Sequence, residues 1–228
     1  MTERKHDERN IEIKCPHLII CEGFDACRYM IYFLQALIKD DPRYEDFQVE
    51  DGKGINDLPT VIKMLPDLPR FNTVKSITII RDSENSPSGA SQSIKSAFRN
   101  GDFAVPPAPC VVALPMENNH NVRTGYALFP ALNSDKATGT LEDLCLNTLA
   151  DPNRDIKLSI VDDAVQASIE QIGALMRPHK NRLHTYLSLT NAFVGLKIGE
   201  SAKANAFDFH CDEVKPLKML LKAMLNDA

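Results

Sequence analysis

VKSITIIRDSEN, residues 74–85, decides the fold, because an apolar run ends here at two acidic residues, Asp82 and Glu84. The run is almost uninterrupted and rich in β-branched isoleucine, which is typical of a strand buried on both faces of a parallel sheet. Such a strand delivers the residues that follow it to the carboxyl edge of the sheet, where ligands bind in open α/β folds. We therefore expect an α/β fold with both acids at that edge.

The two carboxylates repel each other unless a positive charge lies between them. At ~4 Å and an effective dielectric constant near 20, the repulsion is roughly 4 kcal/mol. A divalent cation is the simplest remedy, and hard carboxylate oxygens suit magnesium or manganese better than zinc. The pattern therefore predicts that Asp82 and Glu84 bind Mg²⁺ or Mn²⁺.

Three further strands are predicted from short apolar runs. Residues 17–22, HLIICE, end in an acid, Glu22, and precede a helix with an apolar stripe over residues 30–38. Residues 47–50 form a weaker strand candidate, and CVVAL, residues 110–114, is the predicted fourth strand. Strands that alternate with helices indicate a four-stranded, mainly parallel sheet flanked by helices.

The rest of the chain suggests three parts: a flexible leader over residues 1–14, an α/β domain over residues 15–154, and a helical extension over residues 155–228 packed on the same core. Residues 115–138 show no clear period and are expected to be a long loop, either a cover over the acidic edge or a packed Ω-loop. One predicted apolar stripe of the extension consists of Val161, Val165, Ile169, Ile172 and Met176.

Composition limits the classes of function. With 228 residues and 43% hydrophobic residues, the chain is long enough for one well-buried domain and an appendage. The formal net charge of −5 gives no global basic field of the kind that gathers nucleic acid. Any contact with nucleic acid is therefore expected to be local or mediated by a metal ion.

The charged start, MTERKHDERN, lacks a signal-peptide core, and no apolar run is long enough to span a membrane. We expect a cytoplasmic protein with no membrane partner. Its six cysteines contain no CxxC pair and are expected to be reduced thiols in the core. A zinc site at His179 and His184, or at His210 and Cys211, is the weaker alternative, because these spacings match no standard site.

Three more acids lie near predicted helix starts, and each has a structural alternative. Asp25 either caps its helix or binds a metal ion or water. Thr140 and Asp143 form a capping-box pattern, which gives Asp143 a structural role. Glu142 has no such role, and its alternative is a solvated glutamate favoured by the helix dipole.

The order of these motifs resembles a known family. One predicted strand is followed by Glu22-Gly23, and another ends at Asp82-x-Glu84. These two motifs resemble the signature motifs of the TOPRIM domain of topoisomerases, primases and OLD-type nucleases. From about residue 15 to the C-terminus, the chain is similar to a small stand-alone TOPRIM-like family of undetermined function, akin to the OLD-type nucleases. The matching segments are IICEGFDA, GKGINDL, SITIIRDSEN, VVALP, GTLEDL, HKNRLHTYLSL and FDFHCDEVKPLKMLLKAML.

The resemblance implies a Rossmannoid TOPRIM layer and phosphoryl transfer assisted by Mg²⁺ or Mn²⁺. It implies that Glu22 is the general acid or base, and that Asp82 and Glu84 hold one or two metal ions. Lys180 corresponds to the lysine that OLD-type nucleases place near the scissile phosphate. Further implied metal ligands are Glu142, which matches the acid after the fourth strand, its neighbour Asp143, and Asp25.

Two departures leave the function open. Relatives carry an aspartate four residues after the motif glutamate, where this chain has Ala26, and Glu84 is longer than the usual second acid. The first hypothesis is a metal-dependent nuclease or phosphotransfer enzyme. The second is a catalytically reduced binding or regulatory module that works with a separate ATPase. A small-substrate phosphohydrolase ranks last, because DSENS lacks the haloacid-dehalogenase pattern DxDx[TV]. The partners considered are nucleic acid, an ATPase and a second copy of the chain.

Overall fold

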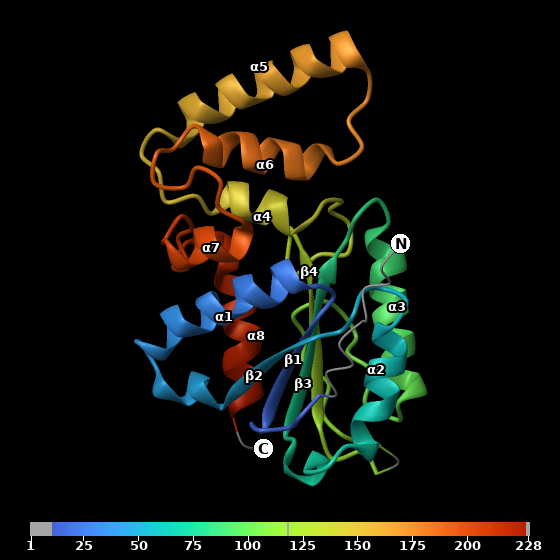
Figure 1. The fold of residues 1–228 in the computed structure, drawn as a ribbon. Helices are drawn as coiled ribbons and strands as arrows, with labels where there is room; N and C mark the ends of the chain where they lie inside the picture. The colour runs from blue at the N-terminus through green and yellow to red at the C-terminus, as the bar shows by residue number, and fades with distance from the viewer. Residues whose placement is uncertain (1–10, 118, 227–228) are drawn as a thin grey trace, which may run out of the picture.

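The computed structural model describes residues 11–117 and 119–226, which form an α/β fold around a four-stranded parallel sheet (Figure 1). The strand order is β2-β1-β3-β4, and all three strand pairs are parallel. The strands are β1 (His17–Cys21), β2 (Phe47–Asp51), β3 (Ser76–Asp82) and β4 (Arg123–Phe129). A parallel sheet flanked by helices confirms the predicted fold class.

Eight α-helices and four 3-10 helices surround the sheet in the described residues. The α-helices are α1 (Phe24–Ile38), α2 (Leu58–Met64), α3 (Pro87–Asn100), α4 (Leu141–Asn147), α5 (Arg154–Ile172), α6 (Pro178–Ser188), α7 (Ile198–Lys203) and α8 (Lys215–Leu225). The 3-10 helices are η1 (Pro42–Asp46), η2 (Leu65–Asp67), η3 (Phe71–Thr73) and η4 (Asp212–Val214).

The sheet separates two apolar layers (Figure 1). Side chains of α2 and α3 pack on one face together with Ile77 and Ile79 of β3. Helices α1 and α8 pack on the other face, together with Ile19 of β1 and Ile80 of β3. All four of these isoleucines are fully buried, as expected for strands covered on both sides. The carboxyl ends of β1 and β3 are thereby held at fixed positions.

The predicted fourth strand was wrong. Residues 110–114 contribute only an isolated antiparallel bridge between Ala113 and Thr124, and the true strand, β4, lies inside the predicted loop over residues 115–138. Cys110 has a positive φ of 57°, which interrupts a regular strand. Gly125 interrupts the apolar pattern of β4, because Met224 and Leu220 of α8 occupy the space of a Cβ atom there.

The edge of β4 is nevertheless covered by this segment. The Cys110 N–H donates to the carbonyl of Tyr126 at 2.7 Å. Ala113 and Thr124 exchange two backbone hydrogen bonds of 2.9 and 3.1 Å. The apolar residues that suggested a strand therefore lie along the sheet edge, and Val111 and Leu114 are 43% and 61% exposed.

The predicted cover over the acidic edge was also wrong for the described residues just before β4. His120 packs against Phe71 and Phe103, with ring centroids 5.5 and 5.0 Å away. Phe71 belongs to η3, which precedes the start of β3, so this segment lies at the amino edge of the sheet. Asn118 falls outside the described residues.

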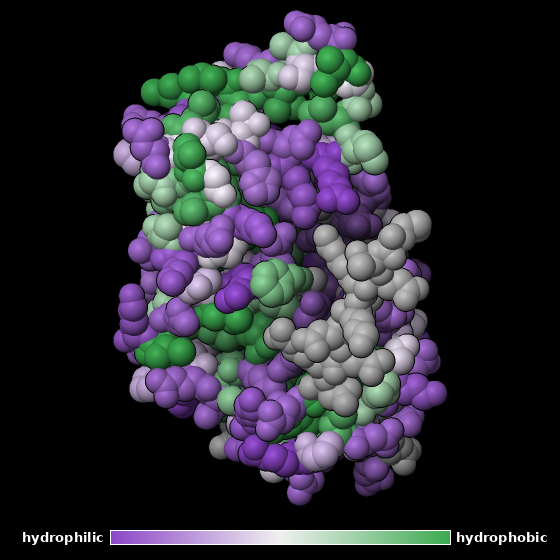
Figure 2. All heavy atoms as spheres, in the orientation of Figure 1, coloured by the Kyte–Doolittle hydropathy of each residue, from purple (hydrophilic) through white to green (hydrophobic). Residues whose placement is uncertain are grey.

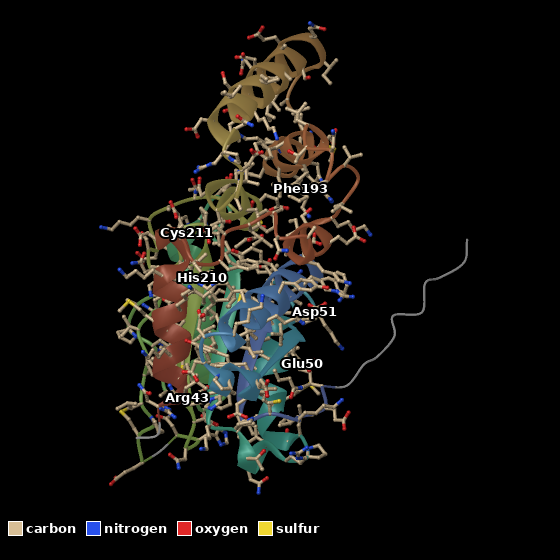
Figure 3. The ribbon with its side chains drawn as sticks, turned by 90° about the vertical axis from the view of Figure 1, so that its left-hand side faces the viewer. Arg43, Glu50, Asp51, Phe193, His210 and Cys211 are labelled. Carbon is tan, nitrogen blue, oxygen red and sulfur yellow. The ribbon has the colours of Figure 1, made fainter. Side chains whose placement is uncertain are left out.

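The helical extension divides into two regions. Helices α7 and α8 pack beside the sheet, whereas α5 and α6 form a pair beyond its carboxyl edge (Figure 1 and Figure 3). The pair still joins the same apolar core through Val161 of α5 and through Leu183, Tyr186 and Leu187 of α6.

The predicted apolar stripe is confirmed only in its first part: Val161 is buried and Val165 and Ile169 are half-buried. Ile172, the last residue of α5, and Met176 beyond it are 77% and 98% exposed. Helix α5 packs on α6 rather than on the sheet, so its outer apolar side chains are uncovered, and Figure 2 shows hydrophobic residues over this end of the molecule.

The N-terminal segment is packed where it is described, from Ile11 onward. Ile13 is buried, and the N–H groups of Lys14 and Cys15 donate to the side-chain oxygen of Gln48 on β2 at 2.7 and 3.1 Å. Residues 1–10 of the predicted flexible leader lie outside the described residues. All six cysteines are free thiols. None of the described helices combines the length and apolar character needed to cross a membrane.

Candidate functional site

The carboxyl ends of β1 and β3 form the floor of an acidic cavity of about 340 Å³. The two strands pair directly, with Cys21 opposite Ile80, so the residues that follow each strand are neighbours. The charged residues that line the cavity are Glu22, Asp25, Arg81, Asp82, Glu142 and Lys180. An adjoining cavity of about 400 Å³ shares Asp82, Glu142 and Lys180, and adds Glu84 and His179. Acids from three distant segments therefore meet at one edge of the sheet.

Asp82 lies at the junction of the two cavities. Its Oδ1 atom accepts a 2.8 Å hydrogen bond from the backbone N–H of Leu141, the first residue of α4. Burial raises the pKa of the Asp82 carboxyl to about 7, although the hydrogen bond from Leu141 opposes the shift. Neighbouring acids raise this pKa further: Glu22, Glu142 and Glu84. The carboxyl of Asp82 therefore changes charge near neutral pH.

Glu22 is held between the sheet and a buried arginine. Its backbone N–H donates to the carbonyl of Ile80 at 3.0 Å, and its Oε2 atom lies 3.3 Å from Nε of Arg81. Burial raises the pKa of Glu22, whereas the positive charge of Arg81 lowers it and the charge of Glu84 raises it. Arg81 is only 3% exposed. The Arg81 Nε and Nη1 atoms and Glu22 Oε2 have no hydrogen-bond partner among the described residues, so the pair interacts through charge alone.

Glu84 joins the end of β3 to the start of α4. Its N–H donates to the carbonyl of Gly139 at 2.7 Å, and the N–H of Gly139 returns a 2.9 Å bond. Gly139 has a φ of +130°, and a Cβ atom there would lie 2.6 Å from Oδ2 of Asp143, so the junction requires glycine. The side chain of Glu84 is exposed and lines the adjoining cavity. Asp82 and the first turn of α4 are therefore held together by the backbone.

Lys180 of α6 lies between two of the acids. Its Nζ atom is 3.4 Å from Oε1 of Glu142 and 3.5 Å from Oδ2 of Asp25. Glu142 is only 3% exposed, so the alternative of a solvated first-turn glutamate is wrong. The capping alternative for Asp25 is wrong as well, because Gly23 occupies the cap position of α1 and Asp25 lies in the first turn. Both acids face the cavity and share one cation.

Asp143 has a structural position. The predicted capping box is confirmed, because the Thr140 N–H donates to Asp143 Oδ2 at 2.8 Å. The other oxygen, Oδ1, lies 2.9 Å from Nδ1 of His179. Asp143 is not among the residues that line either cavity. It therefore orients α4 and α6 rather than contributing a ligand to the cavity as it stands.

Two features of the site escaped the sequence reasoning. Arg81 lies near the end of the buried strand β3. A charged residue within an otherwise apolar strand is a sequence signal from which its role could have been recognised. The Gly52–Gly54 turn wraps the end of β1: the N–H of Gly52 donates to the carbonyl of Cys21 and that of Gly54 to the carbonyl of Glu22, both at 2.7 Å. Figure 3 shows Glu50 and Asp51 at the end of β2, where this turn begins.

The charge balance differs from the expectation that a divalent ion alone compensates the acids. Arg81 and Lys180 already place two positive charges among Glu22, Asp25 and Glu142. Within residues 11–117 and 119–226, no three or more His, Cys, Asp or Glu side chains are gathered as a metal site. Binding of a metal ion would therefore require side chains to leave their present partners.

The fold and the cavity define a parallel α/β protein with a charge-compensated acidic site at the carboxyl edge of its sheet. The chain belongs to the DUF3226 family, described as proteins of unknown function, whose family model matches residues 16–226. No curated protein and no solved structure matches the chain significantly.

Proposed function

We propose that this chain catalyses Mg²⁺-dependent hydrolysis or transfer of phosphodiesters in nucleic acid, through an acidic site of the TOPRIM type related to that of OLD-type nucleases. The observation that carries the proposal is the convergence of Glu22, Asp82 and Glu142 with Lys180 around one cavity. Glu22 directly follows β1, and the other three residues belong to β3, α4 and α6, so their meeting is a product of the fold and not of local sequence. Convergent acids with a perturbed pKa are typical of catalytic sites.

The donor chemistry of the site fits a hard divalent cation. Asp82, Glu84 and Glu142 offer carboxylate oxygens, which Mg²⁺ and Mn²⁺ prefer. Burial among like charges disfavours the charged form of Asp82, and a nearby cation would reverse this effect. Glu142 would have to turn from Lys180 toward the ion. When bound, the ion would neutralise the phosphate charge and stabilise the leaving oxygen.

The chain supplies a proton donor and a phosphate contact of its own. Burial raises the pKa of Glu22, which favours its protonated form more than in an exposed glutamate. Protonated Glu22 can give that proton to the leaving oxygen as the P–O bond breaks, and its carboxylate can take one from the attacking group. The Lys180 side chain is 43% exposed, and its ammonium group could leave the carboxylate of Asp25 and bind a phosphate oxygen instead.

A second candidate function is a catalytically reduced module that binds nucleic acid or regulates an ATPase partner. One observation favours it. Ala26 lines the cavity at the position where the TOPRIM-like relatives carry an aspartate, so a carboxylate is missing there. Arg81 and Lys180 then compensate much of the remaining negative charge without a metal ion.

A cleavage assay separates the two functions. Supercoiled DNA, single-stranded DNA and RNA are incubated with the protein in Mg²⁺, Mn²⁺ or EDTA. We expect metal-dependent cleavage, and a loss of about 100-fold or more in Glu22→Gln, which removes the general acid or base. Glu45→Gln is the matched control, because Glu45 is exposed and remote from the cavity. Thermal unfolding of both variants checks that the fold is intact.

Absence of cleavage by the wild-type protein with all three substrates and both metals would contradict the first function. The assay is then repeated with candidate ATPase partners. Cleavage that needs the partner but survives Glu22→Gln would assign the chemistry to the partner and support the regulatory module.

A further inference from the structure

Phe24 is an exposed aromatic ring at the rim of the acidic cavity. It is the first residue of α1, follows Glu22 and Gly23 directly, and lines the cavity together with Glu22 and Lys180. It is 62% exposed. All ten phenylalanines and five tyrosines lie in the described residues, and each of the other fourteen is buried or half-buried. The one exposed phenylalanine or tyrosine ring among the described residues therefore lies next to the candidate catalytic residues.

A cation on the same helix lies over this ring. Arg28 lies one turn later on α1, and its guanidinium carbon is 5.1 Å from the centroid of the Phe24 ring. The base of the Arg28 side chain packs against α7, because a Cβ atom at Gly199 would lie 2.5 Å from Cβ of Arg28. Phe24 and Arg28 thus form a contacting pair at the edge of the cavity, which we call the rim pair.

The surroundings of the rim pair suit one strand of nucleic acid. Lys180 lies in the cavity beside the acids, and the turn that contains Lys53 borders the same cavity through Gly54. Nucleobases of a single strand can stack on exposed aromatic rings, whereas those of a duplex are already stacked inside the helix. Because the net charge of −5 provides no long-range attraction, recognition has to come from such local contacts.

We propose that the rim pair is a stacking platform for a nucleobase of single-stranded DNA or RNA. The base would lie on the Phe24 ring while the adjacent phosphate enters the cavity toward Lys180. This inference rests on the proposed action on nucleic acid and deepens it, since it names single strands with accessible bases as the ligand.

The chain contains no tryptophan, which makes the platform directly observable. The Phe24→Trp variant would carry the sole tryptophan of the protein at the rim. We expect its fluorescence to be quenched by a single-stranded 12-nucleotide oligothymidine, and not by an abasic oligonucleotide of equal length or by a duplex. Quenching by the abasic strand to the same extent would overturn the proposal.

Affinity is measured separately by fluorescence anisotropy of labelled oligonucleotides in Mg²⁺. The protein carries Glu22→Gln, so that the oligonucleotide is cleaved slowly or not at all during the measurement. Adding Phe24→Ala should weaken binding of the oligothymidine about 10-fold, within the range for loss of one base stack. Binding of the abasic strand should not change. Met219→Ala removes another exposed apolar side chain, 65% exposed on α8, and should leave both affinities unchanged.

The outcomes distinguish this inference from the proposed function. Base-dependent binding without cleavage by the wild-type protein would support the platform in a catalytically reduced module. Cleavage of single strands with no effect of Phe24→Ala on affinity would overturn the platform and leave the enzymatic proposal intact. Failure of all oligonucleotides to bind would overturn the platform as well.

Discussion

The two walls of the acidic cavity compensate charge in different ways. On the sheet wall, Arg81 and Glu22 are 3% and 19% exposed at their side chains and have little room to separate. On the helix wall, the Lys180 side chain is 43% exposed, although its Nζ atom lies at nearly the same distance from its partners, 3.5 Å from Asp25 and 3.4 Å from Glu142. The positive charge of Arg81 is therefore part of the folded core, whereas that of Lys180 is accessible to a ligand from solvent.

The largest expected effect is on the sheet wall. Arg81→Met keeps much of the volume of the side chain but leaves Glu22 buried without its cation, and we expect a loss of about 3 kcal/mol in the free energy of unfolding. Urea denaturation at pH 7 measures this loss. The double variant Arg81→Met with Glu22→Gln should recover most of it, because the uncompensated charge is then absent. A double variant as unstable as the single one would show that Arg81 matters through packing alone.

A smaller effect is expected from the pH dependence of Asp82. The pKa of this carboxyl rises from 3.8 to about 7 on folding, so the folded protein retains a proton that the unfolded chain has released. The stability that protonated Asp82 contributes is fully present below about pH 4 and is lost as the pH rises through 7. In EDTA, we expect most of this pH dependence to disappear in Asp82→Asn, which cannot titrate but whose amide oxygen can still accept from Leu141.

Urea denaturation of the wild type and Asp82→Asn from pH 4 to pH 8 provides the measurement. Because Glu22 also has a raised pKa, the comparison is repeated in a Glu22→Gln background. If the free energy of unfolding depended on pH in the same way for Glu22→Gln with and without Asp82→Asn, a raised pKa at Asp82 would be contradicted.

The smallest effect on stability is expected on the helix wall. Lys180→Met should lower the free energy of unfolding by less than Arg81→Met does, because the Lys180 side chain is 43% exposed and water can take its place beside the buried Glu142. The same variant should bind Mn²⁺ about 5-fold more tightly, since a competing positive charge is removed from Glu142, and should cleave nucleic acid more slowly. Electron paramagnetic resonance of free Mn²⁺ measures the affinity, with Lys203→Met on α7 as the control. Weaker Mn²⁺ binding would exclude Glu142 as a ligand.

Much of the fold could be predicted from two strands. The apolar runs of β1 and β3 each end at an acid, and the parallel pairing of these strands follows from their burial on both faces. Strand β4 could not be predicted in the same way, because Gly125 is needed for the approach of α8 and breaks its apolar pattern. The exposure of Ile172 depends on α5 packing on α6 rather than on the sheet, which no local pattern reveals.

The candidate site was predictable to a similar extent. Glu22 and Asp82 stand out in the sequence because they end apolar runs, and the structure places both at one cavity. The pairing of Arg81 with Glu22 depends on the neighbouring positions of β1 and β3, and so it appears only in three dimensions. Phe24 escaped notice for a related reason: a phenylalanine at the start of a helix is ordinarily expected to be buried.

The segment over residues 110–113 also bears on how the protein behaves at high concentration. An open edge strand can recruit a strand from another molecule and start fibrous aggregates. Here the bonds from Cys110 to Tyr126 and between Ala113 and Thr124 use up polar groups of β4 that would otherwise face outward. Pro106, Pro107 and Pro109 precede this segment, and proline has no N–H with which to extend a sheet. This segment therefore protects the β4 edge of the sheet against pairing with a strand of another molecule.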